Sequence, residues 1–507
     1  MAAPETRLSR ALLADMAAKG VDAELSLSIL DDYNAGLYDG VAPLRASGVP
    51  AVDGRSVVEL GPALSYALPE AEARERLAGL GLEAPAAARA SGGSLSFGRA
   101  ELKELGLALL SRTAYGILNG GSATSYADSK KNLAFGEAAF EAMRPSFESL
   151  APLCKDRPKG LTPAFVNPDG SPGPSFLELK LRARLLLCRA YRERFGEPGR
   201  PVLPVYQMSS VGNDGQLREA YRGYESEPFL AEPAARAGEA PCDLATGVQP
   251  LIAAYSHSAE GRPKRVFDRA YGRPDSVVAL PGGHGQCFRV LAPVLRALRG
   301  SEIRFAYLGN VDNLGYLPDP AELALLALSG LPAGFDFSLR TPMDVKGGIL
   351  VEAADGSRTI ADIGPAISFE EVRRLEAGGS TILFNCATGL FDLDWLVPRI
   401  EGLGRELPVR FTDQDKDAGR YSQAEQVTWE VASLLPGFLA FAVEKSERFI
   451  AAKLLAETLL TSGVARGDRR IPPELAATSR RLSEGLARKL EGAYGLELRG
   501  GRWEAAS

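Results

Sequence analysis

Residues 115–132 read YGILNGGSATSYADSKKN: a strand-like run stops at Gly120 and Gly121, and small hydroxylated residues and two lysines follow. Because glycine lacks a Cβ, the backbone N–H groups of such a turn can approach a ligand closely, and successive N–H groups form a cradle for phosphate. Lys130 and Lys131 could neutralise the charge of that phosphate. A plain strand-to-helix turn is the alternative, since neither a complete P-loop nor a complete GxGxxG pattern is present. The stretch therefore predicts a β-strand whose carboxyl end opens into a loop suited to an anion.

Similar strand-like runs recur downstream, and helical patterns separate several of them. Strands that alternate with helices predict an α/β fold with a mostly parallel sheet. In open sheets of this kind, ligands bind outside the carboxyl ends of the strands, so we expect catalytic or ligand-binding residues in the loops there. The runs are PVLPVYQMSS (201–210), SVVALPGG (276–283), IRFAYLGNVDN (303–313), GGILVEA (347–353) and TILFNCATG (381–389), with helical patterns at 176–196 and 287–300.

The two ends of the chain differ from this middle part. The first hundred residues and the tail from residue 461 show apolar residues at three- and four-residue spacing, which is typical of helices. The stretch ASGGSLSFG, residues 90–98, has the composition of a linker. We therefore expect a mainly helical N-terminal region at 1–100, a central α/β domain at 101–460 and a helical C-terminal tail at 461–507.

Composition narrows the class of protein. The 507 residues carry 58 basic and 64 acidic side chains, a net charge of −6, which argues against a nucleic-acid partner. Five cysteines lie far apart without a CxxC pair, so neither a disulfide framework nor a zinc site is expected. The start of the chain lacks the apolar core of a signal peptide, and the apolar run at 431–443 is shorter than the ~20 residues that span a bilayer. We expect a cytoplasmic protein without a membrane partner.

Two further loops contain residues that could bind a metal ion, a base or a phosphate. In IRFAYLGNVDNLG, Asp312 follows a hydrophobic run, and a carboxylate there can hold Mg²⁺ together with phosphate oxygens and water. The alternative is an Asx-turn that only terminates the strand. In LPGGHGQCF, glycines surround His284, which suits backbone contact with a base or a phosphate, although the histidine could equally be structural.

Two lysines stand out near glycines or apolar residues. Lys346 precedes a Gly-Gly pair in DVKGGIL, and Lys453 lies among apolar residues in RFIAAKLLAETLL. The simplest interpretation of Lys453 alone is a lysine whose stem covers an amphipathic helix while its charge reaches water.

Taken together, six motifs appear in one order: LNGGSATSYADSKKN, LPGGHGQCF, NVDNLG, DVKGG, FNCATGLF and RFIAAK. In that order they resemble the eukaryotic-type UDP-glucose pyrophosphorylase family, with its pattern LNGGxGTSMG…PKS, PPGHGD, NxDNLG, DVKGG, FNTNN and RFLPVK. The resemblance covers about residues 101–460. It implies a Rossmann-like nucleotidyltransferase core and the reaction of UTP with a sugar 1-phosphate, most often glucose 1-phosphate, to give a UDP-sugar and pyrophosphate.

The resemblance also implies roles for residues of this chain. Lys131 or Lys130 would meet the triphosphate, Lys453 would meet the phosphates from the opposite side, and Asp312 would hold Mg²⁺. Gln249 or His257 would read uracil, and Gln249 is favoured because an amide can both donate and accept. The remaining nucleotide-binding candidates are Leu118, Asn119, Gly120, Gly121, Gly283 and His284, and the sugar-binding candidates are Asn310, Lys346, Gly348, Asp362 and Asn385.

Two alternatives remain open at this point. The substrate could be another sugar 1-phosphate, such as galactose 1-phosphate or an N-acetylhexosamine 1-phosphate. The chain could also be a nucleotide-sugar-binding protein that kept the fold and lost turnover, since Ala123 replaces a glycine of the family's first loop.

Overall fold

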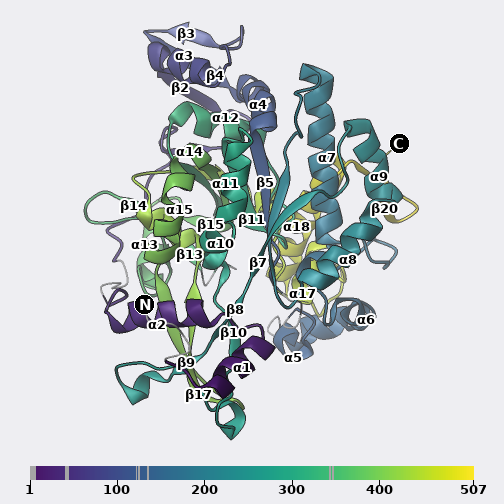
Figure 1. Ribbon diagram of the computed structural model, residues 1–507. Helices are drawn as coiled ribbons and strands as arrows, with labels where there is room; N and C mark the ends of the chain where they lie inside the picture. Colours follow the sequence, from purple (N-terminus) through teal and green to yellow (C-terminus); the bar gives the residue numbers. More distant parts are fainter. Residues whose placement is uncertain are drawn as a thin grey trace.

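A ten-stranded sheet forms the centre of the computed structural model, which describes residues 7–39, 45–121, 123, 126–133, 136–341, 344 and 347–506 (Figure 1). Neighbouring strands of the main path are parallel except where β15 pairs antiparallel with β11 and β12. The predicted α/β fold with a mostly parallel sheet is thereby confirmed. In sheet order the strands are β1 (Val57–Glu59), β18 (Leu439–Val443), β12 (Ala333–Leu339), β15 (Leu383–Asp392), β11 (Phe305–Asn310), β5 (Thr113–Leu118), β6 (Val205–Ser210) and β7 (Leu244–Gln249), with β13 (Gly348–Glu352) and β14 (Arg358–Asp362) beside β15.

The central strands are buried on both faces because successive side chains point to opposite sides of a sheet. In β5, Tyr115 and Ile117 join one hydrophobic core, while Ala114 and Leu118 join the other. The first core lies under α6 (Glu137–Cys154), α7 (Phe176–Phe195), α9 (Pro228–Ala237), α17 (Leu455–Thr461) and α18 (Pro473–Gly492). The second lies under α10 (Cys287–Val290), α11 (Ala292–Gly300), α14 (Leu393–Leu396) and α15 (Ile400–Glu406).

The N-terminal region contains strands as well as helices. A small antiparallel sheet of β2 (Ser65–Pro69), β4 (Ser94–Gly98) and β3 (Arg89–Ser91) packs with α3 (Glu70–Gly79) and α4 (Arg99–Ala108) against α12 (Pro320–Ser329), at the top of Figure 1. The linker interpretation of residues 90–98 is wrong. Gly92 and Gly93 have φ values of 59° and 78° and turn a hairpin, while Leu95 and Phe97 are buried.

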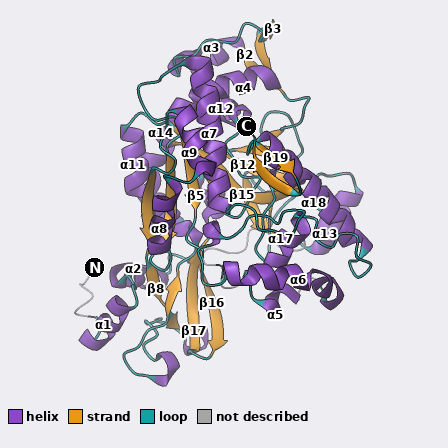
Figure 2. Ribbon diagram, turned by 90° about the vertical axis from the view of Figure 1, so that its right-hand side faces the viewer, coloured by secondary structure: helices purple, strands orange, loops and turns teal. Residues whose placement is uncertain are grey.

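A second small assembly lies at the lower end of the molecule. Helices α1 (Arg10–Ala18) and α2 (Ala23–Asn34) share a core with β8 (Leu251–Ala253) and β9 (Tyr255–Ser256). Strand β10 (Ala279–Pro281), predicted as a strand, pairs with β8 rather than joining the main sheet. Figure 2 shows the hairpin of β16 (Val409–Lys416) and β17 (Gly419–Gln426) extending below the sheet, where β17 pairs with β9.

The C-terminal tail packs onto the first core. Its helix α18 was predicted, but the hairpin of β19 (Leu496–Arg499) and β20 (Arg502–Ala505) was not. Within the described ranges, no helix is both long enough and apolar enough to cross a bilayer. The other helices are α5 (Ser129–Asn132), α8 (Asp214–Tyr224), α13 (Phe369–Ala377) and α16 (Lys445–Arg448).

Candidate functional site

The carboxyl ends of four neighbouring parallel strands meet at one edge of the central sheet. Asn310 of β11 pairs with Leu118 of β5, Leu118 pairs with Met208 of β6, and Gln249 of β7 pairs with Ser210 of β6. Leu118, Asn310 and Gln249 were all predicted to bind substrate from the sequence. The fold therefore brings these predicted residues to the edge where α/β sheets bind ligands.

The glycine loop approaches the end of β7 closely. A Cβ atom built on Gly120 would lie 3.2 Å from Oε1 of Gln249. Nε2 of Gln249 donates to the carbonyl of Gly283 at 2.8 Å, so Gln249 joins the loop at Gly120 to the loop that carries His284. His257 instead lies on the lower assembly, with Nε2 3.7 Å from Oδ2 of Asp413. Of the two residues considered for reading uracil, the structure places Gln249 beside the glycine loop.

The residues that flank Gly120 are bonded in different ways. Asn119 is buried, and its Nδ2 donates to Oε1 of Gln207 at 3.2 Å, while its Oδ1 is buried without a hydrogen-bond partner in the described part of the chain. A Cβ on Gly121 would meet none of the described residues within 4 Å. The described part of the chain therefore leaves space beside Gly121, as a loop that binds a ligand requires.

His284 is held as a neutral hydrogen-bond donor. The backbone N–H of Thr428 donates to its Nδ1 at 3.1 Å, so the ring hydrogen resides on Nε2. Burial and the positive charge of Lys453 lower the pKa of the His284 imidazole to about 4. A positive charge at Lys453 thus favours the neutral form of the His284 imidazole.

Asp312 and Lys453 are brought together by backbone pairing. The backbone N–H of Ala452 donates to the carbonyl oxygen of Asp312 at 3.3 Å. Lys453 follows directly and is exposed, and its backbone N–H donates to the carboxylate of Glu457. The two predicted residues therefore lie on adjoining segments, although they are 141 positions apart in the sequence, from 312 to 453.

Lys159 is a candidate that the sequence analysis missed. Its backbone N–H donates to the carbonyl of Gly121 at 3.1 Å, and its buried Nζ has no hydrogen-bond partner among the described residues. Burial lowers the pKa of the Lys159 ammonium to about 7, although the nearby carboxylates of Asp312 and Glu457 oppose that shift. The ammonium lies over the ring of Tyr126, and an ammonium without a hydrogen-bond partner beside a glycine loop is well placed to receive a phosphate.

A signal for Lys159 is present in the sequence. The family pattern ends its first motif with a proline–lysine pair, and Pro158–Lys159 is such a pair. Helices α5 and α6 lie between this pair and the glycine loop, so the pair is much farther along the sequence than in the family pattern. The pair also occurs at Pro263–Lys264, where Nζ of Lys264 donates to the carbonyl of Ser256 in the lower assembly.

Lys130 and Lys131 lie on the short helix α5, and both side chains are exposed. Asp128 caps this helix by accepting from the backbone N–H groups of both lysines. The next residue, Asn132, is buried and accepts from the backbone N–H of Ala456 at 2.8 Å, which ties α5 to α17. Contact of either lysine with a triphosphate stays a prediction.

Three of the predicted sugar-binding residues lie together. Gly348 and Asp362 are paired across β13 and β14. A Cβ on Gly348 would lie 3.8 Å from Oδ1 of Asp362 and 3.9 Å from the Cβ of Asn385. Arg410, which was not predicted, donates to Oδ2 of Asp362 at 3.0 Å and also pairs with Glu430. Lys346 lies outside the described residues.

The donor set at Asp312 suits Mg²⁺ that arrives with a phosphate ligand. In the parts of the chain that the structure describes, no three acidic, histidine or cysteine side chains gather into a metal cage. Mg²⁺ usually takes one or two carboxylates and completes its shell with phosphate oxygens and water. A single carboxylate within the electrostatic reach of the Lys159 ammonium therefore fits a metal–triphosphate complex better than a resident ion.

Comparison with known proteins agrees with this geometry. Residues 266–462 match the model of a family described as UTP–glucose-1-phosphate uridylyltransferase. No curated protein matches the chain.

Several solved structures share the fold. One is UDP-glucose phosphorylase from Trypanosoma brucei, at 20% identity and a TM-score of 0.54, with 89% of this chain and 77% of the other covered. A second is a putative UDP-N-acetylglucosamine pyrophosphorylase from Entamoeba histolytica, at 16% identity and a TM-score of 0.50, with 69% and 78% covered. A third is a variant UDP-glucose pyrophosphorylase from Leishmania major in complex with UDP-glucose, at 16% identity and a TM-score of 0.52, with 89% and 79% covered.

Proposed function

We propose that this chain, of which residues 266–462 match the model of the UTP–glucose-1-phosphate uridylyltransferase family, transfers a uridylyl group from UTP to a sugar 1-phosphate, with glucose 1-phosphate as the expected acceptor. The observation that carries the proposal is the buried Nζ of Lys159, which lies over the ring of Tyr126, has no hydrogen-bond partner among the described residues and is within the electrostatic reach of Asp312. A cation–π contact replaces only part of the hydration that a buried ammonium loses. The retention of Lys159 is explained if an anionic ligand supplies the missing partner.

In the proposed reaction, an oxygen of the sugar 1-phosphate forms a bond to the α-phosphorus of UTP. The bond from that phosphorus to the bridging oxygen breaks, and pyrophosphate leaves with the electron pair. The attacking phosphate is already an anion, so no strong base is required. The main obstacle is repulsion between like charges, and catalysis depends on positioning and charge neutralisation.

Each residue of the site has a part in this scheme. Lys159 would neutralise the triphosphate from the glycine-loop side, and Lys453 from the side of α17. His284 would donate from Nε2 to a phosphate or ribose oxygen. Asp312 would hold Mg²⁺, which supplies further neutralisation at the α-phosphate when bound. Gln249 would face the base end of the nucleotide.

The residues proposed to bind the sugar lie on β13, β14 and β15. Gly348, Asp362 and Asn385 offer hydrogen-bonding groups that suit hydroxyls, and such groups do not by themselves separate glucose from an N-acetylhexosamine. A panel of acceptors is therefore part of the test. It consists of glucose, galactose, N-acetylglucosamine and N-acetylgalactosamine 1-phosphates with UTP, and ATP, GTP, CTP and TTP serve as donor controls.

Pyrophosphate release from the purified protein tests the proposal. We expect release with UTP and one acceptor, and a loss of at least ~100-fold in kcat for Lys159→Met and for Lys453→Ala, because each removes charge stabilisation in the transition state. Asp312→Ala should abolish the Mg²⁺-dependent rate. Lys103→Ala, a change of an exposed lysine on α4, is the matched control and should retain full activity.

Two results would change the assignment. Near-normal kcat in Lys159→Met together with a large loss in Lys130→Ala or Lys131→Ala would indicate that a lysine of α5, and not Lys159, binds the triphosphate. No release with any pair of substrates, together with measurable binding of UTP or a UDP-sugar, would favour the non-catalytic binding protein.

A further inference from the structure

The two segments that carry Asp312 and Lys453 run side by side. We name them the aspartate loop, residues 310–316, and the lysine segment, residues 448–453. They form a short antiparallel bridge centred on Asn313. The distance between the carboxylate of Asp312 and the ammonium of Lys453 therefore depends on what holds the aspartate loop against the lysine segment.

The side chain of Asn313 forms a large part of that connection. Its Oδ1 accepts from the backbone N–H of Gly315 at 2.9 Å and from that of Ile450 at 3.0 Å. Its Nδ2 donates to the carbonyl of Arg448 at 3.0 Å. The side chain is buried and thus bonds once within its own loop and twice across to the lysine segment. An amide is the side chain that can accept and donate in this way.

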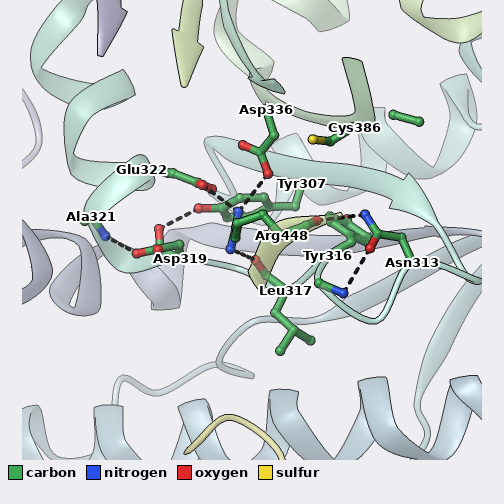
Figure 3. Close-up of polar contacts among 12 residues, drawn as sticks. Tyr307, Asn313, Tyr316, Leu317, Asp319, Ala321, Glu322, Asp336, Cys386 and Arg448 are labelled. Atoms are coloured by element: carbon green, nitrogen blue, oxygen red, sulfur yellow. Dashed lines mark hydrogen bonds and ion pairs between the residues drawn. The ribbon is translucent and has the colours of Figure 1, made fainter. Parts of the chain in front are cut away.

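Arg448 in turn is fixed from three directions. Its guanidinium donates to Glu322 of α12 at 2.5 Å, to Asp336 of β12 at 2.9 Å and to the carbonyl of Leu317 at 3.2 Å. Figure 3 shows Arg448 between these partners, with Asn313 bonded to its backbone. The start of the lysine segment is therefore attached to the sheet, to a helix and to the chain that follows the aspartate loop.

Stability alone does not explain this arrangement. Desolvation of a buried ion pair offsets most of the Coulomb gain, and well-packed apolar residues often serve stability as well or better. A planar guanidinium with several fixed partners does provide a defined geometry. The defined geometry here is that of the backbone which leads to Lys453.

We propose that Asn313 and Arg448 are positioning residues, which set the separation of Asp312 and Lys453 and thereby the alignment of metal, triphosphate and lysine. Neither side chain is placed at the substrate, so both act through other residues. The inference rests on the proposed function of Asp312 and Lys453.

The test compares Asn313→Ala with Asn167→Ala. Asn167 is a suitable match because it is also buried and multiply hydrogen-bonded, donating to Pro172 and accepting from the backbone of Trp503 at 2.9 Å, in the region of the C-terminal hairpin. Arg448→Lys is the second variant, since it keeps the positive charge and loses the planar guanidinium group with its several donors. Thermal unfolding, kcat, KM and the affinity for Mn²⁺ in the presence of UTP, by electron paramagnetic resonance, are measured for each.

We expect Asn313→Ala to lower kcat about 100-fold, the loss that a displacement of about 1 Å in a reacting group can cause. Its Mn²⁺ affinity should fall about 10-fold, as when a group that supports a metal ligand is removed. KM for the sugar 1-phosphate should change less than twofold. Arg448→Lys should shift kcat and Mn²⁺ affinity in the same direction by a smaller factor. Asn167→Ala should lose comparable thermal stability and keep kcat and Mn²⁺ affinity.

A double-variant comparison separates positioning from general damage. If Asn313 acts through Lys453, Asn313→Ala should cost much less in a Lys453→Ala background than in the wild type. Equal losses in both backgrounds, or unchanged Mn²⁺ affinity in both Asn313→Ala and Arg448→Lys, would overturn the inference. A wild-type protein without turnover would refute the proposed function instead, and the Mn²⁺ comparison would still decide the role of Asn313.

Discussion

At the scale of single residues, Lys159 shows how the site opposes stability. Its ammonium is buried over the ring of Tyr126 without a hydrogen-bond partner in the described structure, and burial of a charge that lacks hydrogen bonds is unfavourable. The neighbouring negative charges of Asp312 and Glu457 only partly offset this cost. A ligand phosphate would complete the set of interactions, so the residue is pre-organised for binding at the expense of folding.

This cost leads to a prediction about pH. The folded-state pKa of Lys159 is about 7, below the ordinary lysine value of 10.5, so the unfolded chain holds the extra proton between these values. Folding is therefore penalised most at and below pH 7, and the penalty disappears as pH rises towards 10.5. Lys159→Met should raise Tm by roughly 2–5 °C at pH 7, and by less at pH 9.5. Scanning calorimetry at both values measures the difference, with Lys103→Met as the exposed control; a Met variant less stable than wild type at pH 7 would contradict the account.

At the scale of elements, the two glycines at the end of β5 have different surroundings and should respond differently to a methyl group. A Cβ on Gly120 would crowd Oε1 of Gln249 at 3.2 Å and touch the backbone oxygen of Ser209 at 3.5 Å, while a Cβ on Gly121 would meet none of the described residues within 4 Å. Gly120→Ala should therefore lower Tm. Gly121→Ala should leave Tm unchanged and raise KM for UTP several-fold, because the methyl group would occupy space that the nucleotide needs. Differential scanning fluorimetry and steady-state kinetics on the pair check this, and normal KM in Gly121→Ala would place the nucleotide elsewhere.

Some strands of the central sheet could be predicted from the sequence, and others could not. Strands β5, β6, β11, β13 and β15 were foreseen because polar or glycine-rich loops end their apolar runs. Strand β18 was not, because all five of its residues are buried and an apolar run without alternation cannot be assigned by periodicity. The hairpin of β3 and β4 was mistaken for a linker because glycine and serine are common in both.

Some residues of the candidate site could be predicted from the sequence, and others could not. Asp312, Lys453 and His284 were predicted because each lies in a motif that resembles the family pattern, whereas Gln249 was favoured over His257 only for the chemistry of its amide. Lys159 and Arg410 were not predicted, because their place at the site depends on segments that only the folded chain brings together. Asn313 lies inside the NVDNLG motif, but its hydrogen bonds to Arg448 and Ile450 depend on a segment that only the folded chain brings beside it.

At the scale of the whole molecule, the C-terminal tail is part of the core and reaches the site. Tyr494 is fully buried beneath α7, where its carbonyl accepts from Nε of Arg182 at 2.8 Å. Its hydroxyl donates to the carbonyl of Leu314 in the aspartate loop at 2.7 Å. Leu475, Leu486 and Leu490 of α18 belong to the same hydrophobic core as Tyr115 of β5. The tail therefore has no separate core of its own among the described residues, and it braces the loop that carries Asp312.

This connection predicts the outcome of two changes to the tail. Deleting residues 473–507 would expose the first core to water, so the protein should be insoluble or unfolded. Tyr494→Phe keeps the ring and leaves the Leu314 carbonyl without its donor, which should cost about 1–3 kcal/mol of unfolding free energy. Urea denaturation of Tyr494→Phe, with Tyr271→Phe at an exposed tyrosine as the control, measures that cost. A soluble, cooperatively folded deletion variant would show that the tail is an appended unit, whereas loss of folding on deletion and a measurable cost in Tyr494→Phe would make it an integral part of the catalytic core.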